Sequence, residues 1–77
     1  MRIRPKLDLH GYFHSEVFEI VDEFISENLF QSQVEIVTGY SPRMKEIVRE
    51  VLEEYKLEGK EPLHNSGTLI VNILDKS

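Results

Sequence analysis

The chain has 77 residues, of which 40% are hydrophobic and 30% charged, a balance that argues against disorder and indicates one small domain over residues 1–77. It contains no cysteine, which excludes a disulfide framework and a thiolate metal site. The formal net charge of −5 makes it a poor general binder of polyanions, and its longest apolar run, residues 69–71, is too short to span a membrane. We therefore expect a cytoplasmic protein that does not engage membranes.

Polar and apolar residues alternate strictly over residues 2–10. This period of two predicts a strand with one buried face and one solvent-exposed face. Because Pro5 has no N–H to donate to a neighbouring strand, we expect an edge strand, and we expect Gly11 to end it. The exposed face should carry the polar members of the pattern, which are Arg2, Arg4, Lys6, Asp8 and His10.

Apolar residues at helical spacing predict a first helix over residues 15–29, with its acidic side chains turned to solvent. Ser15 is the expected N-cap. Phe18 and Phe24 are expected in the core rather than on a surface that stacks against a ligand.

A short β-branched run predicts a second strand over residues 34–38, and a second helix follows it. Ser41 is the expected N-cap and Pro42 the first helical residue, because proline is tolerated where the N–H has no helical partner. The apolar stripe of this helix continues to about Tyr55, and Gly59 is the expected stop.

The last part of the chain predicts a weak strand over residues 60–64, a turn at 65–67 and a final strand over 68–74. The element order is then β-α-β-α-β-β. Two helices with one apolar stripe each fit a two-layer α/β sandwich, with a mixed four-stranded sheet and both helices on one face. The other face of the sheet is expected to be open or covered by a partner protein.

Two polar loops that are distant in sequence are expected to form one site. A helix joins the first two strands, so these should be parallel, with their carboxyl ends at the same edge of the sheet. Those ends are residues 8–11 and 38–41.

Asp8 and His10 are two positions apart on a strand, so their side chains should point the same way. A carboxylate beside an imidazole supplies either a general base with its orienting partner or two ligands of a divalent ion. Two simpler readings stay open: His10 bonds backbone at the strand end, and Asp8 only balances the charge of Lys6.

The loop at residues 38–41 also opens a helix, whose first N–H groups form a seat for an anion. Gly39 allows the backbone to approach a ligand closely. Arg43 and Lys45 lie just after the loop and could hold a phosphate. The alternative is an ordinary strand-to-helix turn with an N-cap.

LDLHG at residues 7–11, followed by an amphipathic helix, resembles the opening motif of the Smr (small MutS-related) domain family. TGYS at residues 38–41 resembles the family's second motif, HGxG or TGxG at the end of the second strand. GTLIV at residues 67–71 is similar to the family's final strand, so the resemblance covers essentially the whole chain.

The resemblance implies a fold similar to the C-terminal domain of translation initiation factor 3. It also implies binding of DNA or RNA, often with endonuclease activity and in some members with a divalent metal such as Mg²⁺ or Mn²⁺. The resemblance implies that Asp8 and His10 are the catalytic pair. It also implies that Asp8 is the residue that would bind the metal. With the basic residues noted above, the expected nucleic-acid or phosphate contacts are Arg4, Lys6, Thr38, Gly39, Tyr40, Ser41, Arg43 and Lys45.

The second motif departs from the family pattern. Its second glycine is Ser41, and Pro42 removes one N–H from the anion seat. Tyr40 stands where a basic residue is usual, and its ring offers a platform on which an unpaired base can stack.

Three functions follow from these observations. The first is a stand-alone Smr-like domain that binds DNA or RNA weakly and salt-dependently and nicks it with metal assistance. The second is a non-catalytic module that keeps the scaffold and binds a protein or a nucleic acid. The third is an enzyme that acts on a small phosphorylated ligand through the same anion seat.

Overall fold

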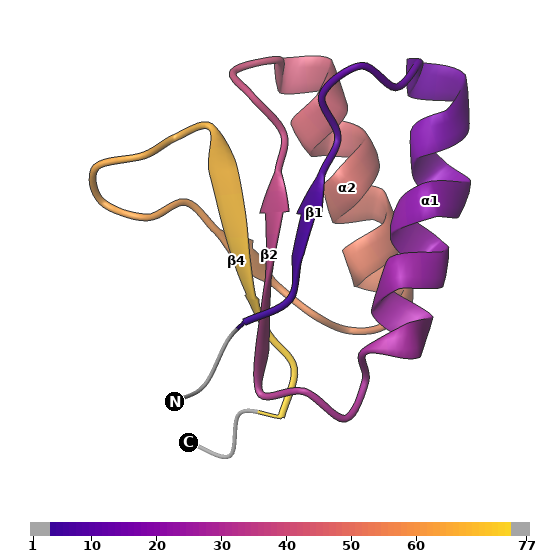
Figure 1. The fold of residues 1–77 in the computed structure, drawn as a ribbon, viewed down its shortest axis with the longest axis vertical. Helices are drawn as coiled ribbons and strands as arrows, with labels where there is room; N and C mark the ends of the chain where they lie inside the picture. Colours follow the sequence, from indigo (N-terminus) through magenta and orange to yellow (C-terminus); the bar gives the residue numbers. More distant parts are fainter. Residues whose placement is uncertain (1–3, 75–77) are drawn as a thin grey trace.

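The computed structural model describes residues 4–74, so Arg2 and Ile3 of the first predicted strand lie outside the described residues. Two helices and a mixed four-stranded sheet form two layers, and both helices lie against the same face of the sheet (Figure 1). The fold class predicted from the sequence is confirmed. The elements in chain order are β1 (Lys6–Asp8), α1 (His14–Glu27), β2 (Gln33–Val37), α2 (Pro42–Glu54), β3 (Gly59–Lys60) and β4 (Thr68–Asn72).

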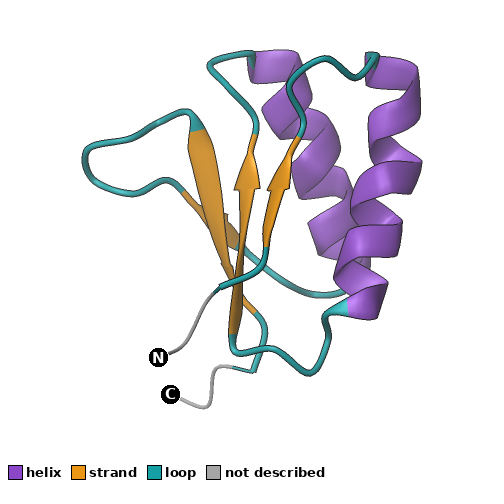
Figure 2. Ribbon diagram, in the orientation of Figure 1, coloured by secondary structure: helices purple, strands orange, loops and turns teal. Residues whose placement is uncertain are grey.

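The strands lie in the order β1-β2-β4-β3, as the view coloured by secondary structure helps to follow (Figure 2). β1 and β2 are parallel, while β4 runs antiparallel to both β2 and β3. β1 therefore lies at an edge of the sheet, where Pro5 accepts a hydrogen bond from Glu35 through its carbonyl oxygen and needs no N–H. The edge position predicted from Pro5 is confirmed.

The core lies between the sheet and the helices. Residues of β1 alternate between exposed and at least partly buried from Arg4 to His10, as the sequence pattern predicted. β2 buries Val34 and Ile36 on the same side, and β4 buries Leu69 and Val71. The helices close the core with side chains at helical spacing, which are Val17, Val21, Ile25, Met44, Ile47, Val48, Val51 and Leu52.

The start of α1 differs from the prediction of Ser15 as N-cap. The N-cap is Phe13, whose backbone N–H donates to Oε1 of Glu16 at 3.1 Å. The phenylalanine ring has no acceptor, so the carboxylate three positions on satisfies the helix end instead. Phe18 is 38% exposed, so the prediction that it is a core residue is wrong, whereas Phe24 is partly buried against the core.

The start of α2 is as predicted: Oγ of Ser41 accepts from the N–H of Met44 at 3.1 Å, and Pro42 is the first helical residue. The predicted stop is wrong. The helix ends at Glu54, and Lys56 takes the left-handed conformation with φ of 58°. Gly59 belongs to β3, where a Cβ would lie 3.0 Å from Cδ1 of Leu52. The glycine thus permits close packing of strand on helix and does not cap the helix.

A hydrogen bond from Tyr55, the C-cap residue of α2, joins the two helices. Its hydroxyl donates to Oδ1 of Asp22 in α1 at 2.8 Å. This hydrogen bond, followed by desolvation and the charge of Asp22, raises the pKa of Tyr55 above its ordinary value. Among residues 4–74, no helix is long and apolar enough to cross a membrane.

Candidate nucleic-acid interface

The carboxyl ends of β1 and β2 meet at one end of the sheet, at the top of Figure 1. Asp8 is paired with Val37 in the parallel register, and the N–H of Leu9 donates to the carbonyl oxygen of Val37 at 3.0 Å. The loops that follow, residues 9–13 and 38–41, therefore leave the sheet from adjacent strands. We call this end of the sheet, with its loops, the rim.

Asp8 and His10 are both exposed at the rim. Oδ1 of Asp8 accepts from the backbone N–H of His10 at 2.9 Å. The carboxylate thus shapes the strand end, a local role that aspartate often takes in turns. Gly11 follows with φ of 92°, a left-handed conformation that favours glycine.

A third loop, residues 65–67, completes the rim, and no sequence pattern predicts its contribution. The carbonyl oxygen of Gly67 accepts from the N–H groups of Thr38 and Gly39 at 3.0 and 2.9 Å. Oδ1 of Asn65 accepts from the N–H of Gly67 at 3.0 Å and holds this turn in shape. The turn residues were visible in the sequence, but the antiparallel pairing of β2 with β4, which brings the turn to the loop at 38–41, has no local signal.

These bonds remove part of the predicted anion seat. The N–H groups of Thr38 and Gly39 are used by Gly67, the N–H of Met44 is used by Ser41, and Pro42 has none. Thr38 is itself buried, and its Oγ1 donates to the carbonyl oxygen of Gly39 at 2.8 Å. Thr38 and Gly39 therefore shape the loop, while Tyr40, Pro42 and Arg43 are exposed.

The basic residues at the start of α2 are paired with acids. Nζ of Lys45 lies 3.0 Å from Oε2 of Glu61, and only 15% of the lysine side chain is exposed. Nη1 of Arg43 lies 3.1 Å from Oε1 of Glu46 one turn further along the helix, and both side chains are exposed. A phosphate that bound here would have to compete with these carboxylates.

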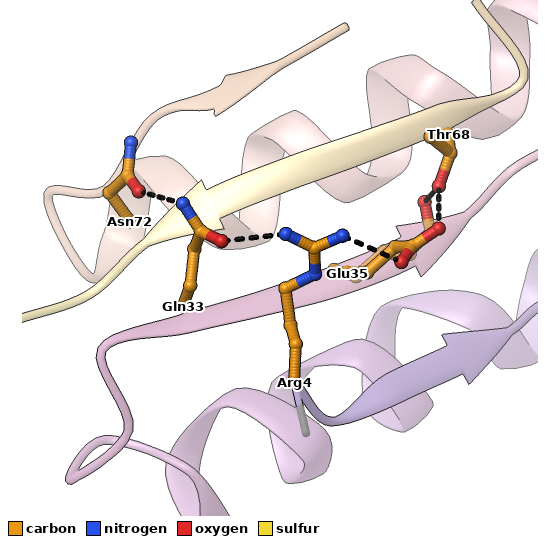
Figure 3. A network of polar contacts seen from close by, with 6 residues as sticks. Arg4, Gln33, Glu35, Thr68 and Asn72 are labelled. Carbon is orange, nitrogen blue, oxygen red and sulfur yellow. Dashed lines mark hydrogen bonds and ion pairs between the residues drawn. The ribbon is translucent and has the colours of Figure 1, made fainter. Parts of the chain in front are cut away.

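Arg4 is likewise paired, on the face of the sheet opposite the helices (Figure 3). Its guanidinium donates to Oε1 of Gln33 at 2.7 Å and lies 3.4 Å from Oε1 of Glu35. Gln33 bonds Asn72, and Thr68 bonds Glu35, so the network spans β2 and β4. Lys6 is exposed and stands opposite Glu35 in the register of the sheet.

Exposed aromatic side chains lie in two of the loops of the rim. Tyr40 is 75% exposed, and Phe13 and Tyr12 in the loop after β1 are 74% and 44% exposed. The Tyr40 ring lies beside the bare Cα of Gly67, because a Cβ built there would be 3.6 Å from Cζ of the tyrosine. The Tyr40 ring thus lies against the turn at residues 65–67.

The residues of the rim do not form a complete metal site. Within residues 4–74, no three His, Asp or Glu side chains are grouped as ligands of an ion. Asp8 is the acidic residue that the resemblance places on the metal side, and one of its oxygens already accepts from His10. The donor set therefore does not fit a divalent metal held by the protein alone.

A broad hollow in the described surface lies away from the rim. It has a volume of about 1350 Å³ and lies at the opposite end of the sheet, where β2 begins. Its lining includes Arg4, Lys6, Glu35 and the exposed ring of Phe30. Arg4 and Lys6 therefore flank this hollow, whereas Asp8, His10 and the loop at 38–41 belong to the rim.

Comparison with known proteins gives no family for this chain. No protein-family model matches it, and no curated protein matches it either.

Proposed function

We propose that this chain is a Smr-like domain that binds nucleic acid at the rim. The observation that carries the proposal is the bond from the N–H of Leu9 to the carbonyl oxygen of Val37, because it joins the LDLHG segment to the residue directly before TGYS. The 26 residues from 12 to 37 lie between these segments in the sequence, so their meeting is a property of the fold. The carboxyl ends of parallel strands are also where open α/β sheets bind ligands.

The rim offers three kinds of contact to a nucleic acid. Exposed aromatic rings can stack on bases, and the exposed imidazole of His10 can bond a phosphate or a base edge. Arg43 and Lys45 supply positive charge once a phosphate displaces Glu46 or Glu61. Binding is therefore weak and is favoured at low salt.

Hydrolysis of a phosphodiester at this site would use His10 as the general base. The imidazole would take a proton from water, whose oxygen attacks phosphorus, and the phosphorus–oxygen bond to the leaving sugar oxygen breaks as that oxygen takes a proton from solvent. Asp8 acts here as a positioning residue, because its carboxylate holds the backbone of His10.

A second candidate function is a non-catalytic interaction module on the same scaffold. One observation favours it: the basic residues Arg4, Arg43 and Lys45 are all paired with carboxylates. A site built to hold a scissile phosphate usually presents cations that are free to reach it.

Two experiments separate these functions. Titration of a short labelled single strand and of a hairpin at low and high salt tests binding, and saturable binding at low salt is expected. A nicking assay on supercoiled plasmid and structured RNA, with Mg²⁺ or Mn²⁺ and with chelator, tests cleavage. If His10→Ala nicks as fast as the wild type under matched conditions, His10 has no catalytic role. Failure to bind either probe at low salt would leave the protein-binding module.

A further inference from the structure

Tyr40 lies in the middle loop of the rim, and the backbone on both sides of it is held by hydrogen bonds. It follows Gly39, whose φ of 69° and N–H bond to Gly67 set the direction of the loop. On its other side Ser41 is held by the cap of α2. The tyrosine is therefore anchored by fixed backbone on both sides, while three quarters of its surface stays in solvent.

The charges around Tyr40 favour stacking over phosphate contact as the source of affinity. Arg43 and Lys45 both have carboxylate partners within 3.1 Å, and the chain carries a net charge of −5. A duplex presents its phosphates outward and hides its base faces, so it needs free cations that this rim lacks. Unpaired bases expose their faces and can stack on a ring without neutralising many phosphates.

From this arrangement we infer that the rim recognises unpaired nucleotides, DNA or RNA, by stacking a base on Tyr40. The inference rests on the proposed function and adds the class of substrate: single strands, loops and ends in preference to duplex. Phe13 and Tyr12 are also exposed, in the loop that follows β1. The affinity then still falls as salt rises, but less steeply than for a site that neutralises many phosphates.

The experiment compares two exposed aromatic residues at opposite ends of the sheet. Tyr40 is 75% exposed at the rim, and Phe30 is 71% exposed beside the hollow where β2 begins. The variants are Tyr40→Leu, Tyr40→Phe and Phe30→Leu, each checked for folding by circular dichroism. The probes are a fluorescein-labelled ten-nucleotide single strand and a blunt duplex of the same sequence, followed by anisotropy at several salt concentrations.

Tyr40→Leu should bind the single strand about tenfold more weakly than the wild type. This is the loss expected when the stacking of one base on an aromatic ring is removed. Tyr40→Phe should keep the wild-type affinity, and so should Phe30→Leu. The wild type should prefer the single strand to the duplex, with a salt slope near that of about one neutralised phosphate.

Three results would overturn the inference while leaving nucleic-acid binding in place. They are an unchanged affinity for Tyr40→Leu, a loss confined to Phe30→Leu, and equal binding of the duplex with a steep salt slope. If the wild type binds neither probe at low salt, the proposed function itself fails and this inference fails with it.

Discussion

Asp8 accepts a hydrogen bond from the backbone N–H of His10 at 2.9 Å, so the two residues expected to form a catalytic pair are joined through the backbone. This contact separates two roles of the carboxylate. Asp8→Asn keeps an oxygen acceptor at the same position and removes the charge, whereas Asp8→Ala removes both.

We expect Asp8→Asn to match the wild type in urea denaturation, and Asp8→Ala to lose about 1 kcal/mol or less, the net worth of one exposed hydrogen bond. A nicking assay on the same variants tests the charge. Because Asp8 acts through the backbone of His10 in the proposed mechanism, Asp8→Asn should nick as fast as the wild type, and loss of nicking in this variant would give the carboxylate charge a direct role. Equal stability of Asp8→Ala and the wild type would show that the bond to His10 does not hold the strand end.

Gly39 tests whether the loop at 38–41 must keep its shape. Its φ of 69° is left-handed, and a Cβ there would meet no atom within 4 Å, so the cost of a side chain is conformational. Gly39→Ala should lower the free energy of unfolding by about 1–2 kcal/mol, and Gly39→Asn by less, because asparagine tolerates this conformation better. Urea denaturation of the three proteins measures both differences. If alanine proves as stable as glycine, the loop adopts another conformation in solution.

The ion pairs of Arg43 and Lys45 predict how nucleic-acid affinity changes when their acidic partners are removed. In the double variant Glu46→Gln with Glu61→Gln, Arg43 and Lys45 lose their partners. Affinity for a single strand should rise, and the slope of log K against log salt should steepen by up to about 1.4, or 0.7 for each phosphate contacted.

The matched control for this prediction is Glu23→Gln with Glu27→Gln on α1, which changes the net charge equally at a distance from the start of α2. Anisotropy titrations at four salt concentrations give the slopes. If both double variants steepen the slope to the same extent, net charge and not the release of Arg43 and Lys45 controls binding.

Tyr55 predicts a pH dependence of stability. Its pKa is raised from 10.0 in the folded state, chiefly by the hydrogen bond to Asp22, so the neutral phenol is favoured by folding. The hydroxyl of Tyr55 therefore contributes to the free energy of unfolding in full below the pKa that it has in the unfolded chain. This contribution is lost as the pH rises through the pKa of Tyr55 in the folded state. Tyr55→Phe should therefore unfold at lower urea than the wild type at neutral pH.

The difference between Tyr55→Phe and the wild type should shrink at strongly alkaline pH. Comparing the two proteins at each pH removes the effect of other groups that titrate in the same range. A gap that stays constant from pH 8 to about pH 12 would mean that the hydroxyl does not bond Asp22 in solution.

The sequence predicted those parts of the fold that local chemistry specifies. Alternation around Leu7 and Leu9 indicated the buried face of β1, Pro5 indicated its edge position, and Ser41 with Pro42 marked the start of α2. Each of these signals lies within a few residues of the feature that it specifies.

Other features depend on contacts that are distant in the sequence. Gly59 resembled a helix stop, but its role is set by the side chain of Leu52 packing against it. Phe13 has no capping atom, so the start of α1 was visible only through Glu16. At the rim, the sequence brought Asp8 and the loop at 38–41 together, but it did not reveal the bonds from that loop to Gly67.

Binding of nucleic acid at the rim can be tested by mapping the contact residue by residue. A chain of 77 residues suits ¹H–¹⁵N correlation spectra recorded during titration with a short single strand. We predict that shift changes gather at residues 8–13, 39–43 and 65–67. Changes confined to residues 30–35 beside the hollow, or to the acidic face of α1, would contradict binding at the rim.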